Sequence, residues 1–378
     1  MTFSIQRSLQ SVVRCSQFTG LFPFNIDEDG SVRISIPFFI LSILTQSTLT
    51  LVSVSFFIFR WAFAFKFNFI HEILISMGQF SIQYAQISLI ISLLTNRKLL
   101  NETFKSLVLL ENVDEPINNT GCLWYPTFCG IILVGAPIME LAADMYHFIS
   151  IELFLIILKW ELAYFAIFQF TGLLAVCRTC FMALENRLKN RLRGYSKWEA
   201  VEKSDQLIKC CETINSCYGS MLLIMLISFF GLITTNLYAA YLKSNYKWTV
   251  FICVLSAFIL LTTFHYLVEA CTKTAETVNK FNRYIRNSII QDILTECAEN
   301  STLTMEVVNR KDMEFTANGY FSINYSLFYS MIETSATYLI ICIQSYTIEF
   351  ISETKPSFEN STGFFNDGTD FQNDSFLA

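Results

Sequence analysis

Seven long apolar stretches constrain the fold of this chain more than any other feature. A helix that spans the hydrocarbon core of a bilayer needs about 20 mostly apolar residues. All seven stretches reach that length, and only 15% of the 378 residues are charged, against about 25% in soluble proteins. We therefore expect an all-α membrane protein, a single domain over 1–378, with transmembrane helices at about 34–59, 69–95, 123–143, 148–176, 216–241, 248–269 and 326–350.

Charge balance and motif content narrow the classes of function. A net charge of −6 does not suggest a nucleic-acid partner. The sequence lacks phosphate-binding glycine loops, nucleophile elbows and zinc-binding histidine pairs, so we expect no enzyme, no cofactor and no metal centre. Two cysteine pairs, Cys177 with Cys180 and Cys210 with Cys211, are compatible with zinc, but ordinary small core residues are the preferred interpretation.

The distribution of basic residues predicts the orientation in the lipid bilayer. Of the 26 Lys and Arg residues, 20 lie in the N-terminal segment and in the loops 96–122, 177–215 and 270–325. Five lie in the segments that alternate with these, and Lys159 falls inside the fourth apolar stretch. Because cytosolic loops carry the excess of Lys and Arg, we expect a cytosolic N-terminus and an extracellular C-terminus.

The C-terminal tail and the cysteines agree with this orientation. The acidic tail carries glycosylation sequons at Asn360 and Asn373, which are usable only outside the cell. Sequons also occur by chance, as at Asn118 and Asn300 in predicted cytosolic loops, so this support is modest. All twelve cysteines fall in cytosolic segments or within helices, as expected of a chain without disulfides.

The long cytosolic segments are patterned as amphipathic helices. Phe181, Leu184 and Leu188 recur at helical spacing, and Ile and Leu residues recur in the same way over 285–294. We expect the fourth, fifth and sixth helices to continue into the cytosol and pack together there. The alternative is a set of separate short amphipathic helices that lie on the membrane surface.

Two ordered motifs near the C-terminal end carry a family resemblance. Residues 315–321 read FTANGYF, and Thr337-Tyr338 is followed, after five residues, by Gln344. In this order, at the end of a chain with seven apolar stretches, they resemble the motifs of the insect gustatory receptor family. The family pattern ends in Phe, whereas this chain has Ser345, so we expect its outer pore gate to differ at that point.

The resemblance implies a function as well as a fold. It implies a ligand-gated, nonselective cation channel of four identical or related subunits, with the seventh helix of each around a central pore. It also implies a small tastant or nutrient as ligand, the plasma membrane of a sensory neuron as location, and an anchor domain between subunits from 177–215 and 270–325. Insect odorant receptors share this architecture and are the nearest alternative. A non-conducting seven-helix signalling receptor is the second alternative, and a transporter is the third.

A polar stripe marks the predicted seventh helix. Glu333, Thr337, Gln344 and Ile348 are offset by 0, 4, 11 and 15 residues, which is one face at about 100° per residue. Such a stripe on a spanning helix is expected to face protein or water rather than lipid. The alternative is that Glu333 hydrogen-bonds another helix of its own subunit and that Thr337 bonds its own backbone. The residues we assign to the pore and gate are Glu333, Thr337, Ile341, Gln344, Ser345 and Ile348.

Polar residues inside other apolar stretches are candidates for a ligand site, because burying them in a membrane is costly. They occur on four predicted helices, and together they would line an aromatic, polar cavity in the outer half of the bundle. The alternative is a structural salt bridge, such as Lys159 with Glu140. The candidates are Gln79, Gln83, Glu140, Asp144, Lys159, Trp160, Asn236 and Tyr238.

Overall fold

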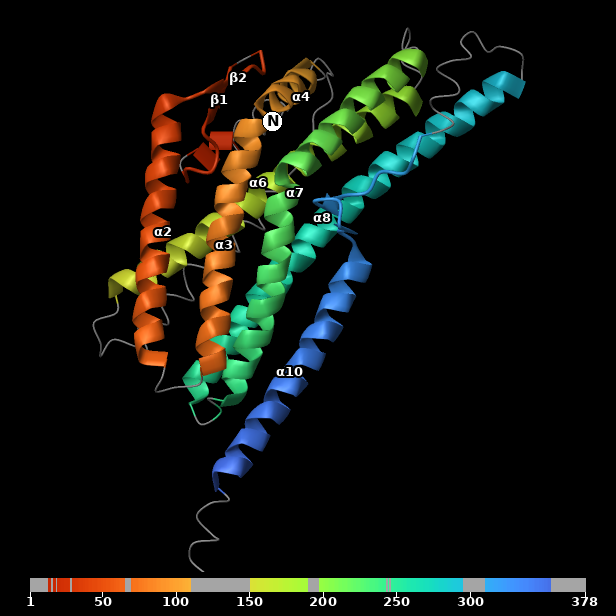
Figure 1. Ribbon diagram of the computed structural model, residues 1–378. Helices are drawn as coiled ribbons and strands as arrows, with labels where there is room; N and C mark the ends of the chain where they lie inside the picture. The colour runs from red at the N-terminus through yellow and green to blue at the C-terminus, as the bar shows by residue number, and fades with distance from the viewer. Residues whose placement is uncertain are drawn as a thin grey trace, which may run out of the picture.

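The computed structural model of this chain consists mainly of long helices (Figure 1). The residues that it describes are 13–14, 16–17, 19–27, 29–64, 69–109, 150–189, 197–242, 244, 246–294 and 310–354. The helices are α2 (Ile36–Ala64), α3 (Phe69–Thr95), α4 (Arg97–Leu109), α6 (Ser150–Lys189), α7 (Lys197–Leu242), α8 (Lys247–Leu294) and α10 (Tyr325–Thr354).

Six of the seven predicted spans coincide with helices of the structure. The stretch 69–95 matches α3 at both ends, and the other five lie within or nearly within α2, α6, α7, α8 and α10. Those five helices are long and apolar enough to cross a membrane. The remaining predicted span, 123–143, lies outside the described residues.

Three helices are much longer than a membrane is thick. The helices α6, α7 and α8 have 40, 46 and 48 residues, so at 1.5 Å per residue they measure about 60–72 Å, against about 30 Å for a hydrocarbon core. Each is continuous, so the amphipathic stretches at their ends are extensions rather than separate helices. Phe181, Leu184, Ile285 and Ile289 are buried in these extensions, which pack against one another within one subunit.

The helix α7 lies at the centre of the bundle and packs closely against α3. The hydroxyls of Ser88 and Ser220 are 2.8 Å apart across the two helices. Ten residues earlier on α3, a Cβ on Gly78 would lie 2.8 Å from the side chain of Leu232. These two contacts fix the antiparallel register of α3 against α7.

A hairpin that the sequence reading did not predict covers one end of the bundle. Strands β1 (Phe24–Ile26) and β2 (Val32–Ile34) pair antiparallel, next to α4. The rings of Phe22 and Phe104 pack edge to face at 6.3 Å, and the amide of Val32 donates to Asn101 Oδ1 at 2.7 Å. The hairpin is thereby joined to α4 at the end of the bundle opposite the end of α10 (Figure 1).

A second short hairpin precedes α10. Strands β3 (Thr316–Ala317) and β4 (Phe321–Ser322) pair antiparallel within the FTANGYF segment. At its turn, Asn318 has φ 52° and Gly319 has φ 79°. Consecutive positive φ values are those of a type I′ turn, for which Asn-Gly is the preferred sequence. Asn324 then caps α10, because its Oδ1 accepts the amide of Leu327 at 3.1 Å.

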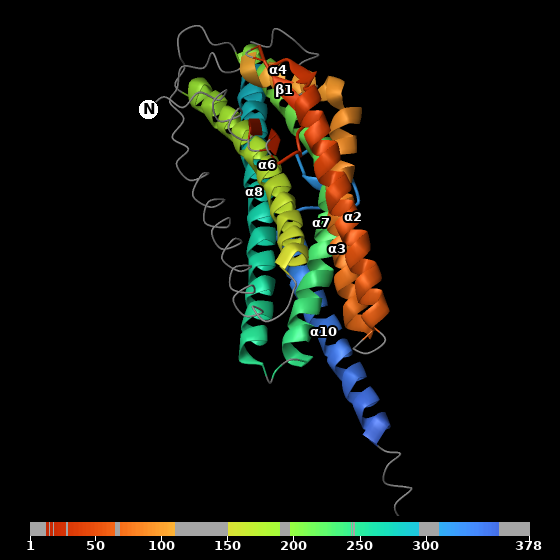
Figure 2. The same ribbon diagram turned by 90° about the vertical axis from the view of Figure 1, so that its left-hand side faces the viewer.

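The helix α10 diverges from the other helices. Both ribbon views show it leaving the bundle beside α7 and α8 and running outward to Thr354 (Figures 1 and 2). Of its 18-residue apolar window only 6% is buried, against 78% for α6 and 67% for α7. Although α10 is apolar enough to cross a membrane, the rest of the described chain therefore covers little of its surface.

Candidate functional site

The two sides of α10 differ in what they contact. Phe328, Met331 and Ser335 face the bundle, and Ser335 is buried. The ring of Phe328 lies 5.3 Å from that of Phe264 and 5.4 Å from that of His265, both on α8. This side therefore attaches the first half of α10 to its own subunit.

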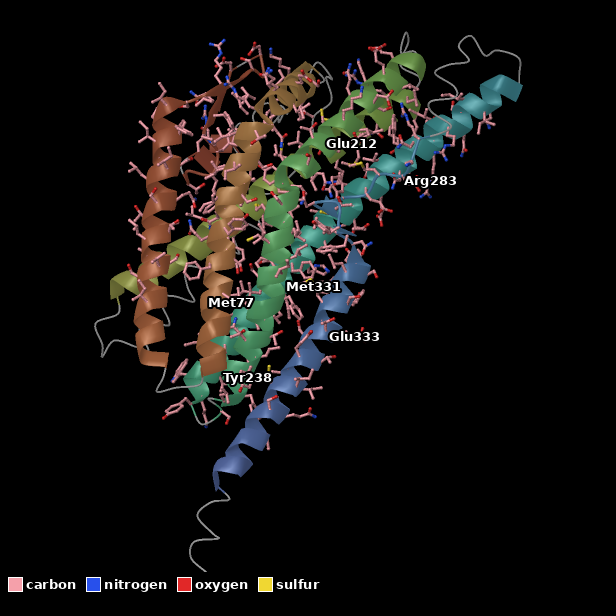
Figure 3. The ribbon with its side chains drawn as sticks, in the orientation of Figure 1. Met77, Glu212, Tyr238, Arg283, Met331 and Glu333 are labelled. Carbon is pink, nitrogen blue, oxygen red and sulfur yellow. The ribbon has the colours of Figure 1, made fainter. Side chains whose placement is uncertain are left out.

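The opposite side carries the predicted pore residues. Glu333, Thr337, Ile341 and Gln344 are exposed on this side, and Ser345 is exposed near the outer end of the helix. Figure 3 shows Met331 on the side toward the bundle and Glu333 on the far side. Ile348 lies on the same helix, and its side chain is outside the described part of the structure. The polar stripe is therefore a surface that the described helices of the subunit leave open.

The described residues give the contacts that Glu333, Thr337 and Ser345 make within the subunit. Within the described residues, the Glu333 carboxylate makes no hydrogen bond and no ion pair, so no described helix of the same subunit satisfies it. Thr337 Oγ1 does donate to the carbonyl of Glu333 at 3.0 Å, as the alternative for that residue proposed. Ser345 Oγ donates in the same way to the carbonyl of Ile341 at 2.9 Å.

The candidate ligand residues are only partly described. Glu140 and Asp144 lie outside the described residues. Lys159 and Trp160 lie on α6 and Gln79 on α3, but the side chains of these three are not described. The salt bridge between Lys159 and Glu140 therefore stays untested. Gln83, Asn236 and Tyr238 are described in full.

Gln83 forms a polar contact between α2 and α3. Its side chain is 3% exposed, and Nε2 donates to Gln46 Oε1 at 2.7 Å. Gln46 was not among the candidates, because its pairing with Gln83 depends on how α2 and α3 rotate against each other. Gln46 Nε2 and Gln83 Oε1 are buried without a hydrogen-bond partner among the described atoms. The pair therefore retains one free donor and one free acceptor.

The described candidates lie at different depths along the bundle. Asn236 is half-buried and Tyr238 is buried on α7. Gln83 stands level with about residue 226 of α7, as the register from Ser88–Ser220 and Gly78–Leu232 shows. Twelve residues of helix separate that level from Tyr238, which is about 18 Å. A cavity that includes both Gln83 and Tyr238 must extend over that length.

Two further polar side chains are fully buried, one on α6 and one on α7. Gln169 on α6 and Tyr218 on α7 are both 0% exposed. Within the described structure, neither amide atom of Gln169 nor the hydroxyl of Tyr218 has a hydrogen-bond partner. Such groups in a polar interior are commonly satisfied by ordered water. Neither residue was a candidate from the sequence. The signal that could have identified Gln169 is a glutamine in the middle of an apolar stretch.

The extensions of α7 and α8 form a polar groove with the segment before α10. The groove has a volume of about 870 Å³. Carboxylates outnumber basic groups along it, and Glu212 is labelled in Figure 3. Its lining residues are Asp205, Ile208, Glu212, Asn215, Ser216, Asn282, Arg310, Lys311, Asp312, Met313, Glu314, Asn318 and Gly319.

The cysteines considered for zinc lie in the interior. Cys177, Cys180, Cys210 and Cys211 form no disulfide and are buried on α6 and α7. Among the described residues, no group of three or more His, Cys, Asp or Glu side chains is arranged to hold a metal ion. In the structure these thiols are therefore part of the hydrophobic packing between the two helices.

Comparisons with known proteins show which proteins this chain resembles. A family model described as 7tm chemosensory receptor matches residues 9–348. Among solved structures, the insect olfactory receptor OR5 from Machilis hrabei matches with a TM-score of 0.67 and 16% identity, over 90% of this chain and 98% of that one. The same receptor in complex with eugenol matches with a TM-score of 0.63 and 15% identity, over the same shares. No curated protein matches significantly by sequence.

At this identity the structural likeness shows the fold, whereas the family model shows the family. The fold is the one that the motifs at 315–321 and 337–344 led us to expect, and the matching family is one of receptors, not of enzymes. On the match over residues 9–348, this chain is a multi-pass membrane protein of the 7tm chemosensory receptor family.

Proposed function

We propose that this chain is a subunit of a ligand-gated, nonselective cation channel in which four copies place α10 around a central pore. The observation that carries the proposal is the exposure of α10. Its apolar window is 6% buried, and Glu333 and Gln344 are exposed on the face that the described helices of its own subunit leave open. A carboxylate that faced lipid at this position would be costly. Neighbouring copies with water between them remove that cost.

The order of residues along α10 supports separate roles in conduction and gating. A ring of Glu333 carboxylates attracts cations and repels anions. Ile340 and Ile341 are 56% and 48% exposed on the same side and would form an apolar constriction beyond that ring. Gln344 and Ser345 lie further toward the outer end, where the family motif ends. We assign selectivity to Glu333 and gating to the segment from Ile341 to Ile348.

The ligand class follows from the motifs and from the eugenol complex of the structural neighbour. That receptor was solved in complex with eugenol, which supports a small-molecule ligand here. The motifs FTANGYF and Thr337-Tyr338 with Gln344 favour a gustatory receptor of a sensory neuron's plasma membrane, for a tastant or nutrient. An odorant-receptor-like channel is the second candidate, because the similar solved structure is an olfactory receptor.

Two measurements on the full-length protein test the proposal. The mass of the purified protein should correspond to four chains. Cells that express this chain should then carry a current whose reversal potential follows the sodium gradient and ignores the chloride gradient. A tetramer without such a current, in the presence of a broad panel of tastants, would favour the non-conducting receptor. A mass that corresponds to one chain would contradict the proposed pore, which needs four copies of α10.

A further inference from the structure

The FTANGYF hairpin is seated on the side of α7 at a glycine. A Cβ added to Gly219 would lie 3.0 Å from the backbone nitrogen of Asn318 and 3.1 Å from its Cα. Real Cβ contacts of this length are rare, so the turn of the hairpin touches α7 where a side chain is missing. The left-handed turn at Asn318 and Gly319 is thus held against Gly219, backbone to backbone.

Two asparagines fasten the same segment to the helices beside it. Asn215, one turn before Gly219 on α7, accepts the amide of Thr316 at 3.2 Å and donates to Thr316 Oγ1 at 3.3 Å. Asn279 on α8 accepts the amide of Met313 at 2.7 Å and donates to its carbonyl at 3.1 Å. Each amide side chain thus binds one residue of the segment 313–316 with two hydrogen bonds.

The hairpin is joined to α10 without a flexible linker. The amide of Ile323 donates to the carbonyl of Phe315 at 2.8 Å, which closes the hairpin one residue before the capping Asn324. Phe315 and Ala317 are buried against the bundle, whereas Tyr320 at the tip is 74% exposed. The position of the first turn of α10 is therefore set by the place where the hairpin meets α7.

Along α10, contact with the rest of the subunit decreases toward the outer end. The ring of Tyr338 lies 5.7 Å from that of Phe230 on α7, in an edge-to-face arrangement. Beyond this pair, Ile341, Gln344 and Ser345 are exposed. Helix α7 therefore holds α10 twice, at the hairpin and at Phe230, while the proposed gate lies beyond both contacts.

From these contacts we infer that Gly219 is a positioning residue for α10: it is the socket that sets where the FTANGYF hairpin, and with it the base of the pore helix, rests on α7. The inference rests on the proposed function, because it assigns to the socket an effect on conduction. A shift of α7 moves the socket, the hairpin and the base of α10 together. Gln344 lies 19 residues beyond Tyr325, about 29 Å along the helix, so a small tilt at the base displaces the gate by more.

The test compares two glycines of the same helix. Gly219→Ala places a methyl against backbone that must shift by a few tenths of an ångström, and Gly231→Ala places the same methyl where nothing lies within 4 Å. Both changes favour the helix equally, since Ala is the stronger helix former. A third variant, Gly319→Ala, loosens the turn from the other side, because its φ of 79° disfavours a side chain while the space around it is open.

Two readouts on the full-length receptor in membranes separate docking from conduction. The first is hydrogen–deuterium exchange of residues 316–324. We expect Gly219→Ala and Gly319→Ala to speed it by about tenfold, and Gly231→Ala to leave it as in wild type. The second is basal sodium current per channel at the cell surface. We expect it to change by about fivefold or more in Gly219→Ala and Gly319→Ala only.

Equal exchange rates and equal currents in Gly219→Ala and Gly231→Ala would contradict the claim that Gly219 seats the hairpin. Faster exchange with an unchanged current, in a wild type that conducts, would overturn the positioning role. A wild type that conducts no current would instead contradict the proposed function. In that case the exchange comparison still decides whether Gly219 seats the hairpin. Should Gly219→Ala fail to reach the membrane, Gly319→Ala carries the same comparison.

Discussion

Arg310 should be the strongest single attachment of the segment that leads into α10. Its side chain is 8% exposed and forms an ion pair with Asp205 on α7, which is 28% exposed. One guanidinium nitrogen also donates to Ser204 Oγ at 2.9 Å, and the Arg310 carbonyl accepts from Arg286 at 2.9 Å. The perturbation is Arg310→Met, which keeps length and apolar contact but removes the charge and every guanidinium bond.

The magnitude follows from burial. Removing one partner of a buried ion pair costs about 3–5 kcal/mol, because the other charge is left without compensation. Asp205 is partly exposed, so water recovers part of this cost, and Ser204 keeps its own bond to the carbonyl of Val201 at 2.7 Å. We therefore expect a loss of about 2 kcal/mol, which lowers an apparent melting temperature by about 2–3 °C in a chain of 378 residues.

The assay is thermal unfolding of the purified full-length receptor in one detergent, followed by intrinsic fluorescence at a fixed scan rate. Lys311→Met is the matched control, because it removes one charge from the neighbouring, exposed residue and should shift the melting temperature by less than about 1 °C. The double variant Asp205→Leu with Arg310→Met removes both charges and should recover most of the loss. A single Arg310→Met variant as stable as Lys311→Met would refute the reasoning.

Three further predictions concern orientation, packing and the gate. An epitope after Ala378 should be labelled on intact cells, and one before Met1 only after permeabilisation; the reverse labelling would contradict the basic-residue argument. Leu188→Asp should lower the yield of folded protein, measured by size-exclusion chromatography, because Leu188 packs against the subunit's own core; normal yield with loss of the tetramer alone would place it between subunits instead. Ser345→Phe should reduce basal current at matched surface expression by narrowing the gate, and an unchanged or larger current would separate Ser345 from the gate.

The spans could be read from the sequence wherever a long apolar run made the helix self-evident. The range 69–95 coincides with α3 because its apolar residues extend from Phe69 to Leu94, close to both ends of the helix. The ends of α6, α7 and α8 were less clear, because each apolar run continues as an amphipathic helix and the composition changes before the helix ends. Helical periodicity predicted that these helices continue beyond their apolar runs, but their lengths of 40–48 residues are known only from the structure.

The hairpins were missed for a different reason. The Asn318-Gly319 pair is a strong local signal for a tight turn, yet its strands are two residues each and lie between helices. Such short strands need contacts with the helices, and the turn of this hairpin meets α7 at Gly219, about 100 positions earlier. Long-range dependence of this kind leaves little trace in a single sequence.

For the candidate site, the sequence predicted a stripe but could not predict its surroundings. Helical spacing places Glu333 and Gln344 on one face, and the structure shows that this face is open. The partner of Gln83 is Gln46, and the 18 Å between the levels of Gln83 and Tyr238 depends on the register of α3 against α7. Helix rotation and register are set by packing, so neither could be read along one helix at a time.

The most direct test of the proposed pore is the effect of Glu333→Gln on ion selectivity. The change keeps the shape of the side chain and removes the charge from an exposed position with no ion pair among the described residues. Patch recording at matched surface expression should show lower divalent permeability relative to sodium, and single-channel conductance that falls most at low salt, where screening is weakest. Unchanged permeability ratios and conductance would contradict a conduction path along this face of α10.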